Sequence, residues 1–131
     1  IRLIGFQRHD ATLSLQRAAD ILVCIGNADP VQVPGKVYEY LGSGRPILHI
    51  ADADDGVAQL LRLTGRGHHC AGNAPAISRT LEMLRQKAGG SSMPSPEIDA
   101  SIFSWANQAK QLETELLRRL ENKNTRVGSS R

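Results

Sequence analysis

Aromatic residues are scarce in this chain: Phe, Tyr and Trp together make up 4% of its 131 residues. Surfaces that bind single-stranded nucleic acid or sugar rings stack these ligands on aromatic side chains, so the composition argues against both kinds of surface. Long apolar runs are missing as well, and none approaches the ~18 residues that a membrane-spanning helix needs. We therefore expect neither a nucleic-acid partner nor a membrane-spanning segment.

Cysteine is also rare, and the positions of the two cysteines bear on the redox setting. Cys24 lies inside an apolar segment predicted as a strand, and Cys70 lies at the end of a later predicted strand. Positions so far apart favour reduced thiols and predict a cytoplasmic protein. Peripheral association with a membrane stays open. The chain begins at Ile1, without Met or a charged-then-apolar leader, and we interpret it as a fragment or processed product of a longer protein.

Hydrophobic residues, 40% of the chain, are mostly aliphatic and gather in short runs. Three of these runs, 1–5, 21–26 and 46–51, are predicted as strands, and a fourth strand is predicted at 67–71. Helical periodicity lies between and after them, over 10–19, 35–42, 56–64 and 75–87. Strands without clean alternation are typical of sheets covered by helices on both faces. The sequence therefore predicts an α/β fold, a Rossmann-like parallel sheet flanked by helices, over residues 1–88.

The C-terminal third has a different composition. Residues 89–97 are rich in Gly, Ser and Pro and are predicted as a linker. Apolar residues spaced by three and four then predict a long amphipathic helix over 98–121, with Trp105 as a packing anchor. The formal charge of +3 owes much to residues 122–131, which we expect to form a disordered, solvated tail.

The stretch from Pro34 to Leu48 is the most informative part of the sequence. It predicts a short helix opened by Pro34-Gly35, a glycine-rich stop at 42–44 and a buried strand. Glu39 is the acidic residue of this otherwise apolar helix, and its carboxylate can accept hydrogen bonds from a vicinal diol such as a ribose. The helix N-terminus can receive a phosphate. Lys36 either neutralises a pyrophosphate or only lies along the helix start, and Gly35 either admits the phosphate or serves only the turn.

This segment resembles the donor-binding segment of GT-B glycosyltransferases of the group 1 type. The pattern there is approximately Pro-x-Lys, hydrophobic, aromatic, Glu, Tyr or Ala, hydrophobic, two small residues, Gly, Lys or Arg, Pro. The matching residues are Pro34, Lys36, Val37, Tyr38, Glu39, Tyr40, Leu41, Gly44, Arg45 and Pro46. Flanking segments are similar too and extend the likeness over most of residues 1–121: Ile1 to Gly5, Ala18 to Cys24, and Phe103 to Trp105.

The resemblance implies the donor-binding part of a glycosyltransferase, expected to be retaining, that uses a UDP- or GDP-sugar and acts on a glycan or lipid-linked acceptor. It also implies an acceptor domain upstream, so this chain alone is expected to bind nucleotide weakly and to transfer no sugar. Gly5 would approach the base. One departure is that Val31 stands where many members have a first glutamate, so the donor sugar is not predicted. No catalytic residue is assigned, and no metal or other cofactor is expected.

Other patterns give weaker signals. Gly26 and Asn27 follow a predicted strand at the edge where open α/β sheets bind ligands. The acidic loop at 52–56 lacks the spacing of a calcium loop, and we interpret it as capping the next helix. A non-catalytic module that binds a partner through the 98–121 helix remains an alternative function. A sugar-nucleotide epimerase is less favoured, because no proton-transfer pair is found.

Overall fold

The structure, a computed structural model, describes residues 2–27, 29, 32–88 and 99–128. The chain divides into two compact units, Ile1–Asp99 and Ala100–Arg131, and each is described by itself. The linker expected at 89–97 lies outside the described residues.

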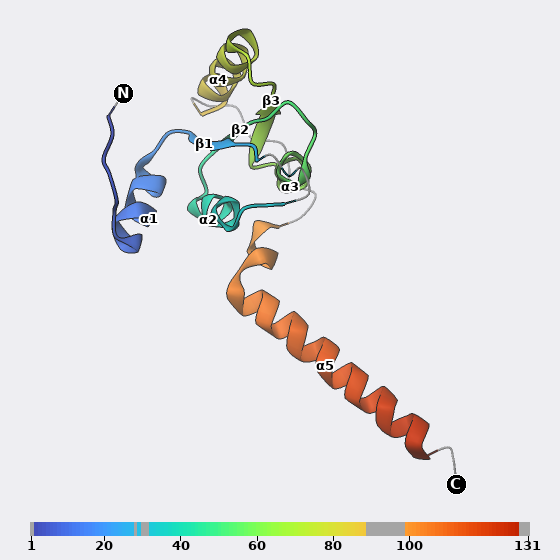
Figure 1. The fold of residues 1–131 in the computed structure, drawn as a ribbon. Coiled ribbons are helices and arrows are strands. Elements are labelled where there is room, and N and C mark those ends of the chain that lie inside the picture. Colours follow the sequence, from blue (N-terminus) through green and yellow to red (C-terminus); the bar gives the residue numbers. More distant parts are fainter. Residues whose placement is uncertain (1, 28, 30–31, 89–98, 129–131) are drawn as a thin grey trace. The chain divides into compact units, whose positions relative to one another are not determined.

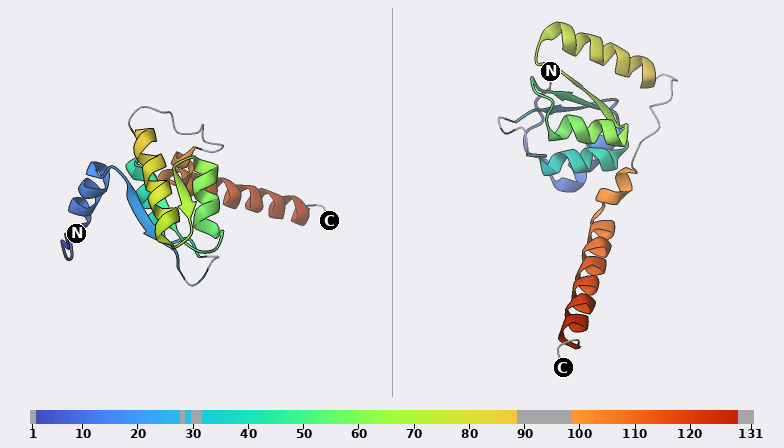
Figure 2. Two further views of the ribbon diagram at one scale, coloured as in Figure 1. Left: turned by 90° about the horizontal axis from the view of Figure 1, so that it is seen from above. Right: turned by 90° about the vertical axis from the view of Figure 1, so that its right-hand side faces the viewer.

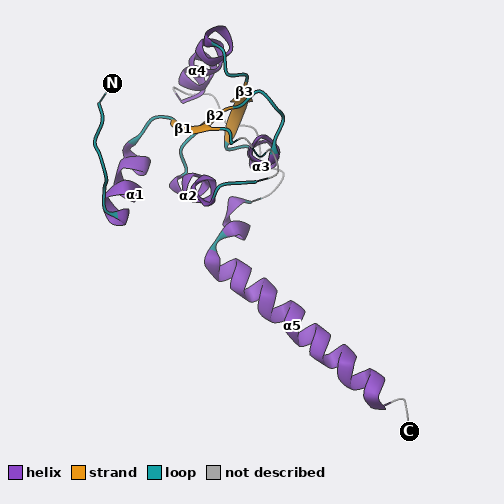
Figure 3. Cartoon of the chain, viewed as in Figure 1, coloured by secondary structure: helices purple, strands orange, loops and turns teal. Residues whose placement is uncertain are grey.

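The first unit contains a three-stranded parallel sheet. Its strands are β1 (Leu22–Ile25), β2 (Ile47–Ile50) and β3 (Gly67–Cys70), arranged in the order β1-β2-β3 (Figures 1 and 3). In the register of this sheet, Ile47 of β2 lies between Leu22 of β1 and Gly67 of β3. The predicted α/β class with an open parallel sheet is confirmed.

Helices cover the sheet on both sides. They are α1 (His9–Ala18), α2 (Gly35–Ser43), α3 (Gly56–Thr64) and α4 (Ala74–Ala88). α2 and α3 lie on one face and α4 lies on the other, while α1 packs against α2 (Figure 2). Each of these elements begins and ends within one residue of its predicted bounds, because apolar periodicity and glycine stops mark them clearly.

The strand predicted at 1–5 is wrong. Residues 2–5 form no regular element, and the side chains of Leu3 and Phe6 are 93% and 97% exposed. Gly5 has a φ of 63°, in the left-handed region that an extended strand does not use. An apolar run becomes a strand only where it pairs with a neighbour, and no described strand lies beside this one.

The core forms on both faces of β2. On the α4 side, Leu48 and Cys70 pack with Leu84. On the other side, Val37 of α2 and Leu61 of α3 are buried as well. The expectation that β1 is also covered on both faces is wrong.

The uncovered part of β1 lies on the α4 side. Val23 and Ile25 are 46% and 73% exposed there. α4 packs on β2 and β3, so this face of β1 has no covering helix among the described residues.

The second unit is helical, with bounds that differ from the prediction. A 3₁₀ turn (Ala100–Phe103) precedes α5 (Trp105–Gly128), where one helix over 98–121 was expected. Ser104 separates them and its Oγ accepts a hydrogen bond from the N–H of Asn107, which caps α5. Residues 122–128, expected in a disordered tail, are helical, and Trp105, the expected packing anchor, is 91% exposed.

No helix in the described part of the chain has the length and apolarity to cross a membrane.

A buried histidine–carboxylate pair joins the central strand to α3. His49 of β2 is fully buried, and its Nε2 lies 2.9 and 2.8 Å from the two carboxylate oxygens of Asp55. Asp55 is also the N-cap of α3, accepting a hydrogen bond from the N–H of Ala58, so the acidic loop caps the helix as expected. Burial would by itself raise the pKa of Asp55, but the Ala58 N–H and the His49 ring together hold that pKa below its ordinary value of 3.8.

Removing this carboxylate is expected to destabilise the first unit strongly. In Asp55→Ala, His49 loses its buried partner and α3 loses its cap, so the free energy of unfolding should fall by about 3–5 kcal/mol. Asp54→Ala is the matched control, because Asp54 pairs with Arg62 where both side chains are more than half exposed, and its loss should be small beside that of Asp55→Ala. Urea unfolding followed by circular dichroism at neutral pH measures both.

The pH dependence of the difference in unfolding free energy between wild type and Asp55→Ala shows whether the ionised carboxylate causes the loss. A carboxylate with a lowered pKa stabilises the fold above its unfolded-state value and loses that contribution as the pH falls through its folded-state value. The gap between wild type and Asp55→Ala should therefore narrow below pH 3.8. Equal losses for the two variants, or a gap that is constant with pH, would contradict this role of Asp55.

Candidate functional site

The N-terminus of α2 is open toward an incoming anion. Its N-cap, Pro34, has no capping side chain, and the first turn carries no acidic residue. Val37 N–H bonds to Pro34 O at 3.0 Å, whereas the N–H groups of Gly35 and Lys36 have no hydrogen-bond partner among the described residues. A Cβ added at Gly35 would meet no atom within 4 Å, so the approach to this turn is unobstructed.

The other two helices that follow strands of the sheet begin differently. The N-terminus of α3 is capped by Asp55, and that of α4 by Asn73, whose Oδ1 accepts a hydrogen bond from the N–H of Ala76 at 3.0 Å. Among the described helices that follow a strand, α2 is therefore the one whose first turn can receive a phosphate without displacing a side chain.

Glu39 lies one turn into α2 and belongs to a three-residue network. Lys36 Nζ lies 2.9 Å from Glu39 Oε2, and Gln16 of α1 donates a hydrogen bond from Nε2 to the same oxygen at 3.3 Å. The hydrogen bond from Lys36, opposed by partial burial and supported by the one from Gln16, lowers the pKa of Glu39 below its ordinary 4.5. Glu39 Oε1 has no hydrogen-bond partner among the described residues, so this atom is available to a ligand.

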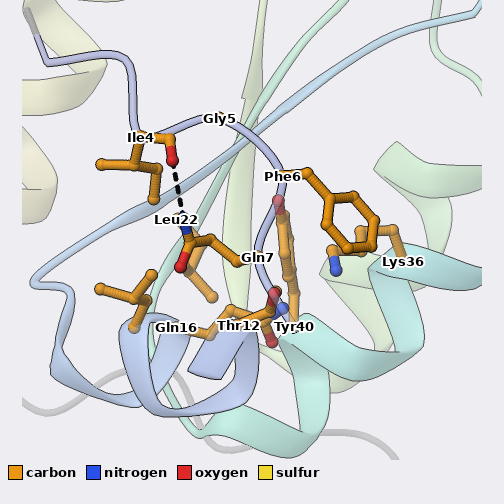
Figure 4. A pocket seen from close by; sticks show the side chains of 10 residues that line it. Ile4, Gly5, Phe6, Gln7, Thr12, Gln16, Leu22, Lys36 and Tyr40 are labelled. Atoms are coloured by element: carbon orange, nitrogen blue, oxygen red, sulfur yellow. Dashed lines mark hydrogen bonds between the residues drawn. The ribbon is translucent and has the colours of Figure 1, made fainter. Parts of the chain in front are cut away.

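A hollow of about 470 Å³ lies between α1, α2 and the loop that carries Gly5 (Figure 4). We call it the α1–α2 hollow. Its lining residues are Ile4, Gly5, Phe6, Gln7, Thr12, Leu15, Gln16, Leu22, Lys36 and Tyr40. Glu39 lines a smaller hollow of about 170 Å³ instead, and Gln16 borders both. The network of Lys36, Glu39 and Gln16 therefore connects the two hollows.

The carboxyl ends of the strands border a third hollow, of about 570 Å³, which we call the strand-end hollow. Gly26 and Asn27 line it, as expected for this edge of the sheet, together with Asp52 and Asp55. Both carboxylates already hold the fold together. Asp52 accepts a hydrogen bond from the N–H of Gly72 at 3.0 Å, and Asp55 bonds to His49. Within the described residues, no three His, Cys, Asp or Glu side chains are placed to bind a metal ion.

The structure thus divides the predicted site residues into groups. Gly5 and Lys36 share the α1–α2 hollow, Glu39 is tied to it through Lys36, and Gly26 and Asn27 lie at the strand-end hollow. Gln16 was missed, although a signal existed. It lies three residues after Leu13 on the apolar stripe of α1, and a polar residue in a buried stripe must find a partner.

The two glycines nearest these hollows are expected to respond differently to alanine. A Cβ at Gly26 would lie 2.6 Å from Ala51 Cβ, so Gly26→Ala should lower the free energy of unfolding by about 1–3 kcal/mol. Gly35→Ala meets open space at an ordinary φ and should leave that free energy unchanged or raise it by up to ~1 kcal/mol. Urea unfolding of both variants decides this. Destabilisation of Gly35→Ala would mean that Gly35 serves the turn itself.

Comparison with known proteins adds no relative to this picture. No known protein family, no curated protein and no solved structure matches the chain. The open N-terminus of α2 and the network at Glu39 are therefore the features from which a function can be inferred.

Proposed function

We propose that the first unit is the donor-binding part of a glycosyltransferase that uses a UDP- or GDP-sugar. The single observation that carries the proposal is the start of α2. This short helix begins with uncapped N–H groups and carries Lys36 in its first turn. One turn later it carries the carboxylate of Glu39, which has a free oxygen. The segment from Pro34 to Pro46, which resembles the donor-binding segment of GT-B enzymes, supports it from the sequence.

Each part of the nucleotide then has a chemically suited partner. The diphosphate lies against the first turn of α2, where Gly35 leaves the backbone accessible and Lys36 supplies a positive charge. The ribose hydroxyls donate to the carboxylate of Glu39, which is kept ionised by Lys36 and Gln16. Charge that develops on the leaving diphosphate is stabilised by the same N–H groups and the same cation. In enzymes with this segment the acceptor is bound by another domain, so we expect this chain to bind the donor nucleotide without transferring sugar.

The role of Glu39 can be tested by measuring UDP and GDP affinities with titration calorimetry. Glu39→Gln removes a charge-assisted hydrogen bond to the ribose, so we expect the affinity for the nucleotide that binds to fall about 10- to 100-fold. Glu82→Gln is the matched control, because Glu82 also pairs with a cation three residues away, Arg85, on an exposed helix face. It should leave the affinity unchanged.

Deoxynucleotides show whether Glu39 contacts the diol itself. The 2′-deoxy and 3′-deoxy forms of the nucleotide that binds should bind wild type more weakly, and Glu39→Gln should no longer discriminate them from the ribonucleotide. If Glu39→Gln and Glu82→Gln bind equally well, or if the variant still discriminates, Glu39 does not hold the diol and the proposal fails.

One further observation favours a second candidate function, a non-catalytic module that associates through α5. Leu112, Leu116 and Leu120 lie on one stripe of this helix and are 61%, 52% and 59% exposed. An exposed apolar helix stripe is commonly buried against a second helix, and the partner at hand is α5 of another copy of the chain.

Sedimentation velocity over a range of protein concentrations tests this second candidate. Self-association of the wild-type chain should be abolished by Leu116→Glu, which places a charge in the stripe. Gln111→Glu, which introduces the same negative charge on the far side of the helix, should leave self-association unchanged. A wild-type chain that stays monomeric at all concentrations would contradict a role for α5 in pairing.

A further inference from the structure

Gln16 is a buried polar residue whose hydrogen bonding is half complete. Gln16 is 5% exposed, and its Nε2 donates a hydrogen bond to Glu39 Oε2. Its carbonyl oxygen, Oε1, is buried and has no hydrogen-bond partner among the described residues. A buried acceptor without a partner destabilises a protein, so such atoms mark places where something else completes the bond.

The orientation of this amide is fixed by its neighbour. If the amide were turned over, Oε1 would face the carboxylate of Glu39, and two acceptors would repel each other. The lowered pKa of Glu39 means that this carboxylate is ionised at neutral pH. Gln16 therefore offers its unpaired group as an acceptor only, although a free glutamine could offer either a donor or an acceptor.

The α1–α2 hollow that Gln16 borders suits a planar heterocycle. The side chains of Phe6 and Tyr40 line it, with aliphatic Leu22 beside them and Lys36 on the α2 side (Figure 4). Aromatic rings of this kind accept bases by stacking, whatever the base, so they do not by themselves select one. The choice among bases would fall to the polar group that meets the base edge.

We propose that Gln16 selects the base of the bound nucleotide, its Oε1 accepting a hydrogen bond from a ring imide N–H. This inference rests on the proposed function, since it takes the ligand of the hollow to be a nucleotide. Uracil at N3 and guanine at N1 carry such an N–H. Cytosine and adenine have a bare ring nitrogen at the corresponding edge, and its lone pair would face Oε1. An acceptor fixed opposite that ring position favours the first pair, because cytosine and adenine can donate to it only from the neighbouring exocyclic amino group, after the base has shifted.

The test is titration calorimetry of the full chain with UDP, GDP, CDP and ADP. Wild type should bind UDP or GDP at least about tenfold more tightly than CDP and ADP, and the difference between UDP and GDP identifies the base. Gln16→Met keeps the length of the side chain but removes the acceptor, so the preference should fall to within about threefold. Its midpoint of thermal unfolding should not fall, because the variant no longer buries an unpaired oxygen. Gln59→Met, an exposed change on α3, should keep the wild-type preference.

A modified ligand provides a check that needs no variant. The N3-methyl derivative of UDP or the N1-methyl derivative of GDP, whichever parent binds, lacks the imide N–H and should bind wild type at least about tenfold more weakly.

Three results would overturn the inference: equal affinity of wild type for all four nucleotides, an equal loss for all four in Gln16→Met, or undiminished binding of the methylated ligand. These results bear on the choice of base and leave untouched the proposed binding of a nucleotide donor at α2, a proposal that fails instead if Glu39→Gln has no effect. If no nucleotide binds to wild type, both fail together.

Discussion

The fold depends on the pairing of His49 with Asp55. β2 is the central strand and both of its faces are covered, so a histidine there is taken fully out of water. A buried imidazole must have partners for its ring nitrogens, and the carboxylate of Asp55 supplies one at 2.8 Å, with Cys24 O near the other at 3.3 Å. Since Asp55 also caps α3, one side chain attaches the strand, the following loop and the next helix to each other.

With α3 capped by Asp55, α2 is the helix, among the described helices that follow a strand, that begins without a capping side chain. At the strand-end hollow the carboxylates of Asp52 and Asp55 are fixed by backbone and imidazole groups, and α3 and α4 begin with capped N-termini. α2 begins without a cap and with a lysine in its first turn. No side chain caps the positive end of α2. The charge of Lys36 is opposed by Glu39, one turn later.

Most helices and strands of the first unit could be predicted from the sequence, and the predictions that failed did so for physical reasons. The predicted bounds of α3, 56–64, are those of the structure. Gly56 follows the acidic residues that cap the helix, and Gly65 follows the last residue of its apolar pattern. The strand predicted at 1–5 failed because pairing, which periodicity does not contain, decides whether an apolar run becomes a strand. Glu39 was singled out by its unusual position in an apolar helix, and the structure adds its hydrogen bonds with Lys36 and Gln16. The apolar stripe of α1 marks Gln16 as a residue that needs a partner, but its pairing with Glu39 depends on how α1 packs against α2, which the sequence does not specify.

The pair His49–Asp55 and the pair Lys36–Glu39 differ in burial, and this difference determines how much each contributes to stability. His49 and Asp55 are held away from water, so separating them would leave an uncompensated buried charge, at a cost of several kcal/mol. Lys36 and Glu39 are 45% and 34% exposed, and a pair so accessible to solvent contributes about 1 kcal/mol or less. In the proposed donor site, a diphosphate would draw Lys36 away from Glu39 at little cost, and the carboxylate would then accept the hydroxyls of the same ligand. The proposed site requires a weak pair, because Lys36 and Glu39 would each have to exchange the other for the ligand.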